Sequence, residues 1–266
     1  MRSVGFAAMK GPMPPPPTFE ARLASARLLS DSVRELVFER ADGEAVAFTA
    51  GQWVTLVLPI APGPDAPATD RAHPELRRSY SIASPPGPSA RFELAVTRVD
   101  GGPGSSFLHA MKPGDALRVV GPQGFFTRPR ERSGPSLFIA TGTGVTPLRS
   151  MLRAALSEGE TRPLWLLLGG RAEPDLLYRD EFDALARLHP NVRAFYTLSR
   201  APDEWAGLRG YVQTHARGLW SELQRADCGA PHAYICGLQR MVGATRDLLR
   251  NELAAEREQV HSERYD

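Results

Sequence analysis

The stretch Ser136–Met151 holds the residues of this chain best suited to binding an anion. Leu137–Ala140 is an apolar run typical of a buried strand, and Thr141–Gly144 is a glycine-rich turn that a ligand can approach closely. Thr146 has the chemistry of a helix N-cap, and Pro147 suits the first helical position. Free N–H groups and a helix dipole would then converge on one spot. We predict a nucleotide-phosphate turn here; an ordinary tight strand-to-helix turn is the alternative.

A second candidate site combines two stretches of the first half of the chain. In Arg78–Ser84 an arginine, an aromatic ring and hydroxyls alternate along a predicted strand, so the arginine and the ring share one face. A cation beside a flat ring can hold a phosphate and a planar heterocycle together. Gly101–Leu108 is another glycine-rich turn, in which Ser105 or Ser106 can cap a short helix and create an anion site. Two phosphate turns imply two nucleotides or one bridging dinucleotide.

Four motifs occur in the order and approximate spacing of one known family. They are Arg78–Ser84, Gly102–Ser106, Gly142–Pro147 and Cys236–Leu238. With them the chain resembles the plant-type ferredoxin–NADP(H) reductase superfamily, from about Thr18 to the C-terminus. The resemblance implies an antiparallel Greek-key β-barrel that binds FAD, followed by a Rossmann-like α/β domain with a parallel sheet that binds NADPH.

The resemblance assigns residues to the FAD site. Arg78 and the Gly104–Ser106 turn would hold the pyrophosphate. Tyr80 and Ser81 would lie against the isoalloxazine, with Ser81 near its N5. The full set is Arg78, Ser79, Tyr80, Ser81, Val96, Arg98, Gly104, Ser105 and Ser106. Taken alone, the segment around Tyr80 is also compatible with a strand that has a surface arginine and a core tyrosine.

Further residues are assigned by the resemblance to the nicotinamide nucleotide. Gly142–Gly144 would face its pyrophosphate, and arginines suit a 2′-phosphate because the guanidinium fork matches anionic oxygens. Arg200, Arg209 and Tyr211 match the pattern of NADPH-dependent members, so NADPH is predicted over NADH. NADH-dependent relatives can also carry Gly-Tyr-Val, which is the alternative. The full set is Thr143, Gly144, Arg171, Ser199, Arg200, Arg209, Tyr211, Gln213 and Gly237.

The C-terminus carries a tyrosine at a position that matters for flavin chemistry in this family. Plant-type reductases end in Glu-x-Tyr, with the Tyr stacked on the flavin face that the nicotinamide must occupy. Glu263 and Tyr265 match this ending, whereas Asp266 after the Tyr departs from it. The resemblance implies Ser81, Cys236, Glu263 and Tyr265 as catalytic residues. The alternatives are a last edge strand that carries an aromatic, and a buried structural thiol.

Composition bounds the remaining possibilities. With 266 residues, 42% of them apolar and 23% charged, the chain is long enough for two soluble domains. A formal net charge of +2 gives no argument for nucleic acid or a membrane surface. Two cysteines cannot hold a four-thiolate iron–sulfur cluster, and they favour a reducing, cytoplasmic compartment. We see no signal peptide, no membrane span and, from six scattered histidines, no metal site.

Patterning along the chain divides it into three parts. Residues 1–17 are predicted to be a disordered proline-rich leader, residues 18–133 the FAD-binding barrel and residues 134–266 the nucleotide-binding α/β domain. Ile60–Glu75 is predicted to be a solvated loop and Pro129–Gly134 the interdomain linker. The predicted barrel strands are Val33–Glu39, Gln52–Leu58, Arg78–Ile82, Phe92–Val99 and Ala116–Val120. The predicted parallel strands are Leu137–Ala140, Leu164–Leu168, Val192–Leu198 and Ala233–Cys236, with helices at Asp180–Leu188 and Leu238–Leu253.

These features predict an FAD-dependent oxidoreductase that moves electrons between NADPH and a small acidic one-electron carrier, ferredoxin or flavodoxin, and works as a monomer. We place carrier docking near Arg128, Arg130 and Arg132, where unlike charges would steer the encounter. Two alternatives stay open. One is a reductase component that uses NADH or NADPH to serve an oxygenase or cytochrome partner, and the other is a flavin-binding electron-transfer subunit without nicotinamide chemistry.

Overall fold

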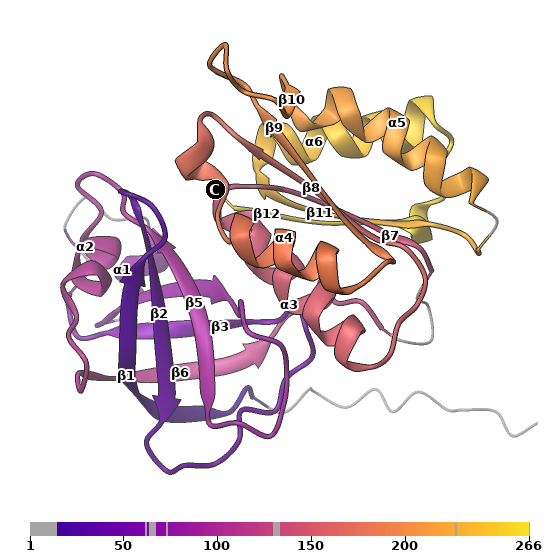
Figure 1. Ribbon diagram of the computed structural model, residues 1–266. Helices are drawn as coiled ribbons and strands as arrows, with labels where there is room; N and C mark the ends of the chain where they lie inside the picture. The colour runs from indigo at the N-terminus through magenta and orange to yellow at the C-terminus, as the bar shows by residue number, and fades with distance from the viewer. Residues whose placement is uncertain are drawn as a thin grey trace, which may run out of the picture.

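The first half of the chain forms a six-stranded antiparallel sheet that curls into a barrel (Figure 1). The structure is a computed structural model that describes residues 15–61, 63, 68–72, 74–129, 134–226 and 228–265. The strands are β1 Thr18–Leu28, β2 Val33–Arg40, β3 Trp53–Leu58, β4 Leu76–Ser81, β5 Arg91–Thr97 and β6 Ala116–Gln123. They lie in the order β4-β3-β6-β1-β2-β5. The Ala83 N–H, just after β4, donates to the Glu93 carbonyl oxygen of β5 at 2.8 Å and joins the two outer strands.

Alternating apolar residues fill the barrel. In β5 the side chains of Phe92, Leu94 and Val96 are all fully buried, as one inward face of a strand requires. Phe92 stacks on Phe38 of β2 with ring centroids 5.6 Å apart. Burial of each such side chain stabilises the fold by roughly 1.5–3 kcal/mol. Two short helices, α1 Ala68–Arg71 and α2 Pro103–Ala110, belong to this half, and α2 packs against β4 and β5.

The second half of the chain alternates strands with helices and forms a six-stranded parallel sheet. Its strands are β7 Ser136–Thr141, β8 Leu164–Gly170, β9 Val192–Leu198, β10 Leu208–Arg209, β11 His232–Leu238 and β12 Val260–Tyr265. Its helices are α3 Val145–Ser157, α4 Arg179–Leu188, α5 Val212–Arg225 and α6 Gln239–Asp247. The strand order is β10-β9-β8-β7-β11-β12. From β7 the strands β8, β9 and β10 are added on one side, and β11 and β12 then lie on the other side. Because the strand order reverses at β7, a crevice is expected at the carboxyl end of this strand.

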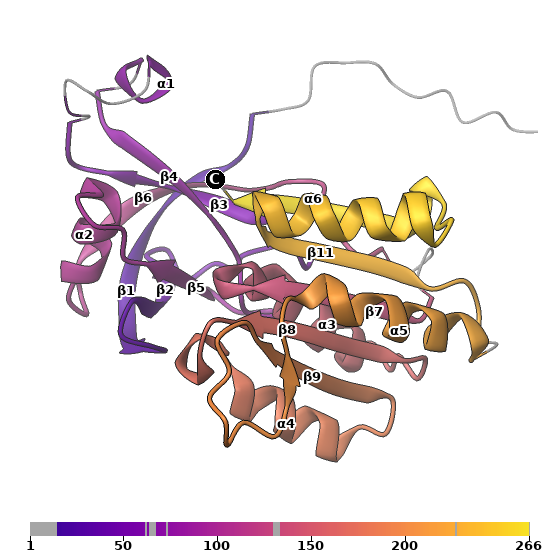
Figure 2. The ribbon, with the colours of Figure 1, turned by 90° about the horizontal axis from the view of Figure 1, so that it is seen from above.

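Helices cover both faces of the parallel sheet (Figures 1 and 2). On one face, Phe138 and Ala140 of β7 pack with residues of α3 and α4. On the other face, Leu137 and Ile139 pack with residues of α5 and α6. A strand buried on both faces needs a continuous apolar run rather than an alternating one, which is the pattern of β7.

The predicted two-domain fold is confirmed, but two predictions about helices of the second half are wrong. Helix α3 begins at Val145, directly after a 3₁₀ turn at Gly142–Gly144, so Thr146 is not an N-cap. The Thr146 hydroxyl instead donates to the Thr143 carbonyl oxygen at 2.8 Å, inside the first turns. The single helix predicted for Leu238–Leu253 is divided, because α6 ends at Asp247 and a π-helical turn follows at Leu248–Glu252.

The arginine cluster predicted to dock a carrier has a different role at its first member. Arg128 is buried; its Nε donates to Ser136 Oγ at 2.9 Å and its Nη2 to Glu160 Oε2 at 2.8 Å. The hypothesis that Arg128 meets a carrier is therefore wrong. Arg130 and Arg132 lie outside the described residues, as do residues 1–14 of the predicted leader and parts of the predicted 60–75 loop.

Candidate active site

The end of β4 meets the C-terminal strand at the junction between the barrel and the parallel sheet (Figures 1 and 2). The Tyr265 phenol donates to Ser81 Oγ at 2.7 Å, and Ser81 Oγ donates to Glu263 Oε1 at 3.2 Å. Glu263 and Tyr265 are two residues apart on β12, so their side chains leave the strand on the same face. Ser81 is buried, with 5% of its surface exposed. The structure thus brings together three of the four residues predicted to be catalytic.

Cys236, the fourth residue, lies on the neighbouring strand. It pairs with Glu263 in the parallel register of β11 and β12 and is fully buried. Burial raises the pKa of the Cys236 thiol, and the Glu263 charge raises it further, while a hydrogen bond with Tyr265 acts in the opposite direction. A thiol with a raised pKa is a poor nucleophile at neutral pH. Cys236 is therefore suited to packing in the core of the domain rather than to covalent chemistry.

The two acidic groups beside Ser81 also have displaced pKa values. Burial raises the pKa of the Glu263 carboxyl, and the hydrogen bond from Ser81 partly offsets this effect. Burial likewise raises the pKa of the Tyr265 phenol well above its ordinary value. Titratable groups with displaced pKa values that gather in one place are typical of functional sites.

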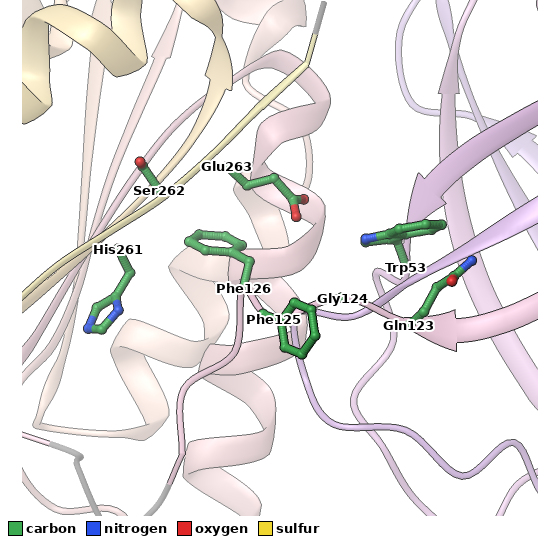
Figure 3. Close-up of a pocket in the computed structure, with 8 residues that line it drawn as sticks. All are labelled: Trp53, Gln123, Gly124, Phe125, Phe126, His261, Ser262 and Glu263. Carbon is green, nitrogen blue, oxygen red and sulfur yellow. The ribbon is translucent and has the colours of Figure 1, made fainter. Parts of the chain in front are cut away.

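A cavity of about 590 Å³ opens beside Glu263 (Figure 3). Figure 3 shows Trp53 of β3 and Glu263 of β12 on opposite sides of this cavity. It is lined by Trp53, Gln123, Gly124, Phe125, Phe126, His261, Ser262 and Glu263. The cavity gives the Glu263 carboxylate access to solvent, which the buried Ser81 hydroxyl lacks. Of these lining residues, only Glu263 was predicted from the sequence to be functional. The glycine-containing turn at residues 121–124 is the sequence feature that could have indicated the cavity.

Arg78 lies against the N-terminus of α2, as predicted from the two separate motifs. A Cβ built on Gly104 would come within 3.1 Å of Arg78 Cγ, so a larger residue here would push this side chain away from the first turn of α2. No side chain caps that turn, which starts at Pro103 with Gly102 as the N-cap. A guanidinium and the free N–H groups of a helix N-terminus form a cradle for an anion. These residues fit the pyrophosphate of a dinucleotide.

The other residues predicted to bind FAD differ in their burial and in their hydrogen-bond partners. The hydroxyl of Ser105 bonds to the backbone of Val99 and to the Gly102 carbonyl oxygen, so neither Ser105 nor Ser106, which lies farther along α2, is its cap. Ser79 bonds to the Thr55 hydroxyl across the strands at 3.1 Å. Burial raises the pKa of Tyr80 to about 12. Val96 is fully buried in the barrel core, whereas Arg98 is exposed after β5. Roles in binding FAD stay predictions for all of them.

The turn after β7 packs directly on the end of β11. A Cβ on Gly144 would lie 2.3 Å from the Cys236 carbonyl oxygen, and one on Gly237 would lie 2.6 Å from Thr141 Oγ1. Gly237 also has a φ of +144°, a conformation that L side chains rarely adopt. Thr141 Oγ1 is buried and has no hydrogen-bond partner among the described residues. An unpaired polar atom beside this turn fits a ligand that would complete its hydrogen bonding.

A cleft of about 640 Å³ runs from this turn along the carboxyl ends of the parallel strands. Predicted nucleotide residues among those that line it are Gly142, Arg171, Ser199, Arg200, Tyr211 and Gln213. The Arg200 N–H donates to the Arg171 carbonyl oxygen at 3.0 Å, so two arginines from different strands become neighbours. The barrel residues Ser30, Ser32 and Thr97 form part of the opposite wall. The cleft therefore combines the partly buried Gly142 of this turn with a pair of arginines suited to a phosphate.

Some residues of this cleft differ from the prediction. Arg209 does not line it: its guanidinium donates to the carbonyl oxygens of Ala201, Pro202, Asp203 and Trp205 and braces that loop. A phosphate contact for Arg209 stays a prediction. Arg240, at the start of α6, lines the cleft but was not predicted; its place just after the Cys236–Leu238 motif is the signal that could have found it. Thr143 belongs to the same turn as Gly142 but does not line the cleft.

The described part of the chain offers neither a metal centre nor a membrane-spanning helix. Among those residues no group of three or more His, Cys, Asp or Glu side chains could hold a metal ion. No helix within the same ranges is long and apolar enough to cross a membrane.

A barrel with one anion cradle, joined at Ser81 to a parallel sheet with a second anion-binding cleft, defines a two-domain oxidoreductase for a flavin and a nicotinamide nucleotide. Residues 20–127 match the family described as oxidoreductase FAD-binding domain, and residues 138–247 match oxidoreductase NAD-binding domain. The chain is 56% identical over 249 residues to ferredoxin–NADP reductase B of Sorangium cellulosum, covering 93% of this chain and 98% of that protein. It belongs to the ferredoxin–NADP reductase family.

Two other similar proteins have names that assign them to an oxygenase or a cytochrome P450. The chain is 34% identical over 200 residues to the DmpP reductase component of phenol 2-monooxygenase from a Pseudomonas species, covering 74% of this chain and 52% of that protein. Its fold resembles the crystal structure of Amycolatopsis cytochrome P450 reductase GcoB with a TM-score of 0.78 and 27% identity, covering 97% of this chain and 73% of that one. The chain thus spans only about half the length of DmpP.

Proposed function

We propose that the protein is an FAD-dependent ferredoxin–NADP⁺ reductase, which exchanges electrons between NADPH and a one-electron carrier. The observation that carries this proposal is the cluster of Tyr265, Ser81 and Glu263, which joins the barrel to the last strand of the parallel sheet by two hydrogen bonds. When bound, FAD would accept a hydride, two electrons and one proton, from NADPH and release the electrons one at a time, which amino-acid side chains cannot do. The protein binds and orients the two nucleotides.

In the barrel, Arg78 and the N-terminus of α2 would hold the FAD pyrophosphate. Arg78 Cγ lies close to Gly104 in the first turn of α2, and the Arg78 guanidinium would turn toward this helix end, where its charge and the free N–H groups would act together on the phosphates. Tyr80 follows Arg78 on the same face of β4 and would lie against the isoalloxazine. Ser81 points from the opposite face toward Tyr265 and Glu263.

In the parallel-sheet domain, the Gly142–Gly144 turn would receive the NADPH pyrophosphate. Arg171 and Arg200 are joined by a backbone hydrogen bond and both line the cleft, so a 2′-phosphate bound beside them would meet two guanidinium groups. NADH lacks this phosphate, so the pair favours NADPH. Ser199 lines the same cleft and would add a hydroxyl contact.

At the junction, Ser81 and Glu263 form a path for a proton. Ser81 Oγ donates to Glu263 Oε1, and the Glu263 carboxylate lines the cavity that opens to solvent. A proton could therefore pass between solvent, the Glu263 carboxyl and the Ser81 hydroxyl without leaving hydrogen-bonding distance. Tyr265 covers Ser81 and keeps water from that hydroxyl until a nicotinamide displaces the ring.

The electron carrier that we propose is ferredoxin or flavodoxin. We also propose that the reductase is a monomer and that it works in the cytoplasm. The name of the Sorangium relative supports ferredoxin. The names of DmpP and GcoB support the alternative of a reductase that serves an oxygenase or a cytochrome. Reduced enzyme offered separately to ferredoxin, flavodoxin and a cytochrome would discriminate these partners, because only a matched carrier is reduced rapidly at low concentration.

The test of the proposed function starts with purified protein. We expect it to contain FAD, and we expect NADPH to bleach the flavin absorbance faster than NADH under anaerobic conditions. Ferredoxin or flavodoxin should then restore the absorbance. Protein that takes up no FAD, or bound FAD that NADPH does not reduce, would contradict the proposal.

A further inference from the structure

A buried arginine joins the two domains close to the point where their sites meet. Arg149 lies in the second turn of α3 and is 4% exposed. Its Nη1 donates to the Ala83 carbonyl oxygen at 2.9 Å and to Glu93 Oε2 at 2.5 Å, both in the barrel half. Its Nε donates to the two carboxylate oxygens of Glu181 in α4, at 3.0 and 2.8 Å. One guanidinium group therefore bonds to both domains.

The residue after Arg149 makes a parallel contact. The Ser150 hydroxyl, also buried, donates to the Ser84 carbonyl oxygen at 2.7 Å. The segment that α3 holds in this way directly follows Ser81 along the chain. At its own N-terminus, α3 continues from the Gly142–Gly144 turn. The same helix thus fixes the residues after Ser81 and carries the turn of the nucleotide cleft.

Arg149 makes more polar interactions than a side chain that only fills space between the domains would need. A buried guanidinium needs partners for its donors, and Arg149 has carboxylates from both domains as well as a backbone carbonyl. Its Cζ also lies 4.4 Å from the centre of the Tyr178 ring. Apolar residues could fill the same volume with similar or greater stability, but they would not specify one relative placement of the domains. A rigid fork with several fixed partners does specify it.

We propose that Arg149 is a positioning residue for flavin reduction, a role that rests on the proposed function. By tying the segment after Ser81 to α3, it sets the spacing between Ser81 and the Gly142–Gly144 turn, and hence between the flavin ring and the nicotinamide. Reactions between two bound groups depend steeply on their geometry, and a misplacement of about 1 Å can cost about a hundredfold in rate.

Rapid-mixing measurements on FAD-loaded Arg149→Lys and Glu93→Gln variants test this role. Glu93→Gln leaves Arg149 paired with Glu181 and is the variant expected to fold in any case. For both variants the rate of flavin reduction at saturating NADPH should fall about tenfold or more, because the reacting geometry is lost. Reoxidation of chemically reduced enzyme by ferricyanide, which needs no nucleotide cleft, should stay within about twofold of wild type.

Hydrogen exchange on protein free of nucleotides gives a readout that does not depend on activity. Backbone amides of residues 82–93 should exchange faster in both variants, because their attachment to α3 is weakened. Arg128→Lys is the matched control: Arg128 is a similarly buried arginine that also joins the two domains, but its hydrogen bonds within the described residues go to Ser136 and Gly134, at the start of β7, and to Glu160. This control should lose stability and keep the wild-type rate of reduction per bound flavin.

Two results would overturn the positioning role. One is flavin reduction at the wild-type rate in both variants; the other is an equal fall in reduction and reoxidation, which marks Arg149 as a general structural residue. Wild-type protein that holds FAD but is not reduced by NADPH would instead overturn the proposed function and this inference with it. Hydrogen exchange would still report whether Arg149 holds the two domains together.

Discussion

The Tyr265 phenol donates a hydrogen bond of 2.7 Å to the Ser81 hydroxyl, which lies 184 positions earlier in the chain. The last strand of the parallel sheet thereby closes over the last residue of a barrel strand. Glu263, on the same face of that strand, accepts a hydrogen bond from the same hydroxyl. Two residues of the C-terminus therefore determine what can reach Ser81.

Replacement of Tyr265 should change coenzyme use. Tyr265→Ser is expected to tighten nicotinamide binding and to raise kcat/KM with NADH, because a competitor for the stacking position is removed. Tyr265→Phe is the matched control, since it keeps the ring and loses the hydroxyl that bonds to Ser81. It should retain the preference for NADPH. Equal kinetics of wild type and Tyr265→Ser with both coenzymes would show that the ring does not cover the flavin.

Arg200→Ala should discriminate between the two coenzymes. Loss of one charge-assisted contact with a 2′-phosphate is expected to weaken NADPH binding by about 1.5–3 kcal/mol and to leave NADH binding nearly unchanged. Arg209→Ala is the comparison, because its guanidinium braces the 201–205 loop through backbone carbonyl oxygens. It should affect both coenzymes alike. Titration of each variant with both nucleotides measures this, and equal losses for Arg200→Ala would make that residue structural.

The contrast between these arginines shows how far sequence reasoning reached. Arg200 closely follows β9, a strand that the sequence pattern predicts, so its place at the ligand edge of the sheet could be predicted, and the cleft includes it. Arg209 matched a family pattern, but its contacts depend on the fold of the loop before it, for which no local pattern exists. Element types were predictable because burial imposes periodicity. Partners of individual polar side chains were not.

The same limit applies to buried arginines. Arg128 was expected on the surface, where charged residues are usual, yet it is buried beside Glu160. The role of Arg149 was not predicted, because its helix shows only an apolar pattern and its partner Glu93 lies 56 positions away in the sequence. Helix starts were misplaced for a related reason, since Thr146 bonds to a carbonyl of a 3₁₀ turn that the sequence pattern does not reveal.

Glu263 should make stability depend on pH in a defined direction. Its pKa in the folded protein is raised by burial above the ordinary 4.5, so folding favours the protonated form. Its contribution to the free energy of unfolding should therefore fall as pH rises from about 4.5 through the raised pKa, and then level off. Glu263→Gln should be more stable than wild type above this range and similar to it below pH 4.5. Urea denaturation across pH measures both, and a constant difference would refute the assignment.

Glu160 should act in the opposite direction. Burial alone would raise the pKa of its carboxyl, but hydrogen bonds from Arg162 and Arg128 outweigh this and lower it to about 2. The resulting stability is present above about pH 4.5 and is lost as pH falls toward 2. Glu160→Gln should lose about 3–5 kcal/mol at neutral pH, because it leaves a buried guanidinium without its charge partner. Its acid unfolding should also be flatter; parallel pH curves for the two proteins would contradict this.

Anaerobic mixing of the FAD-loaded protein with NADPH tests the central claim most directly. The account predicts that the visible absorbance of oxidised flavin is lost rapidly with NADPH and more slowly with the same concentration of NADH. It also predicts that oxidised ferredoxin or flavodoxin, added next, restores that absorbance. Flavin that stays oxidised in the presence of NADPH would contradict the account, whatever the protein binds.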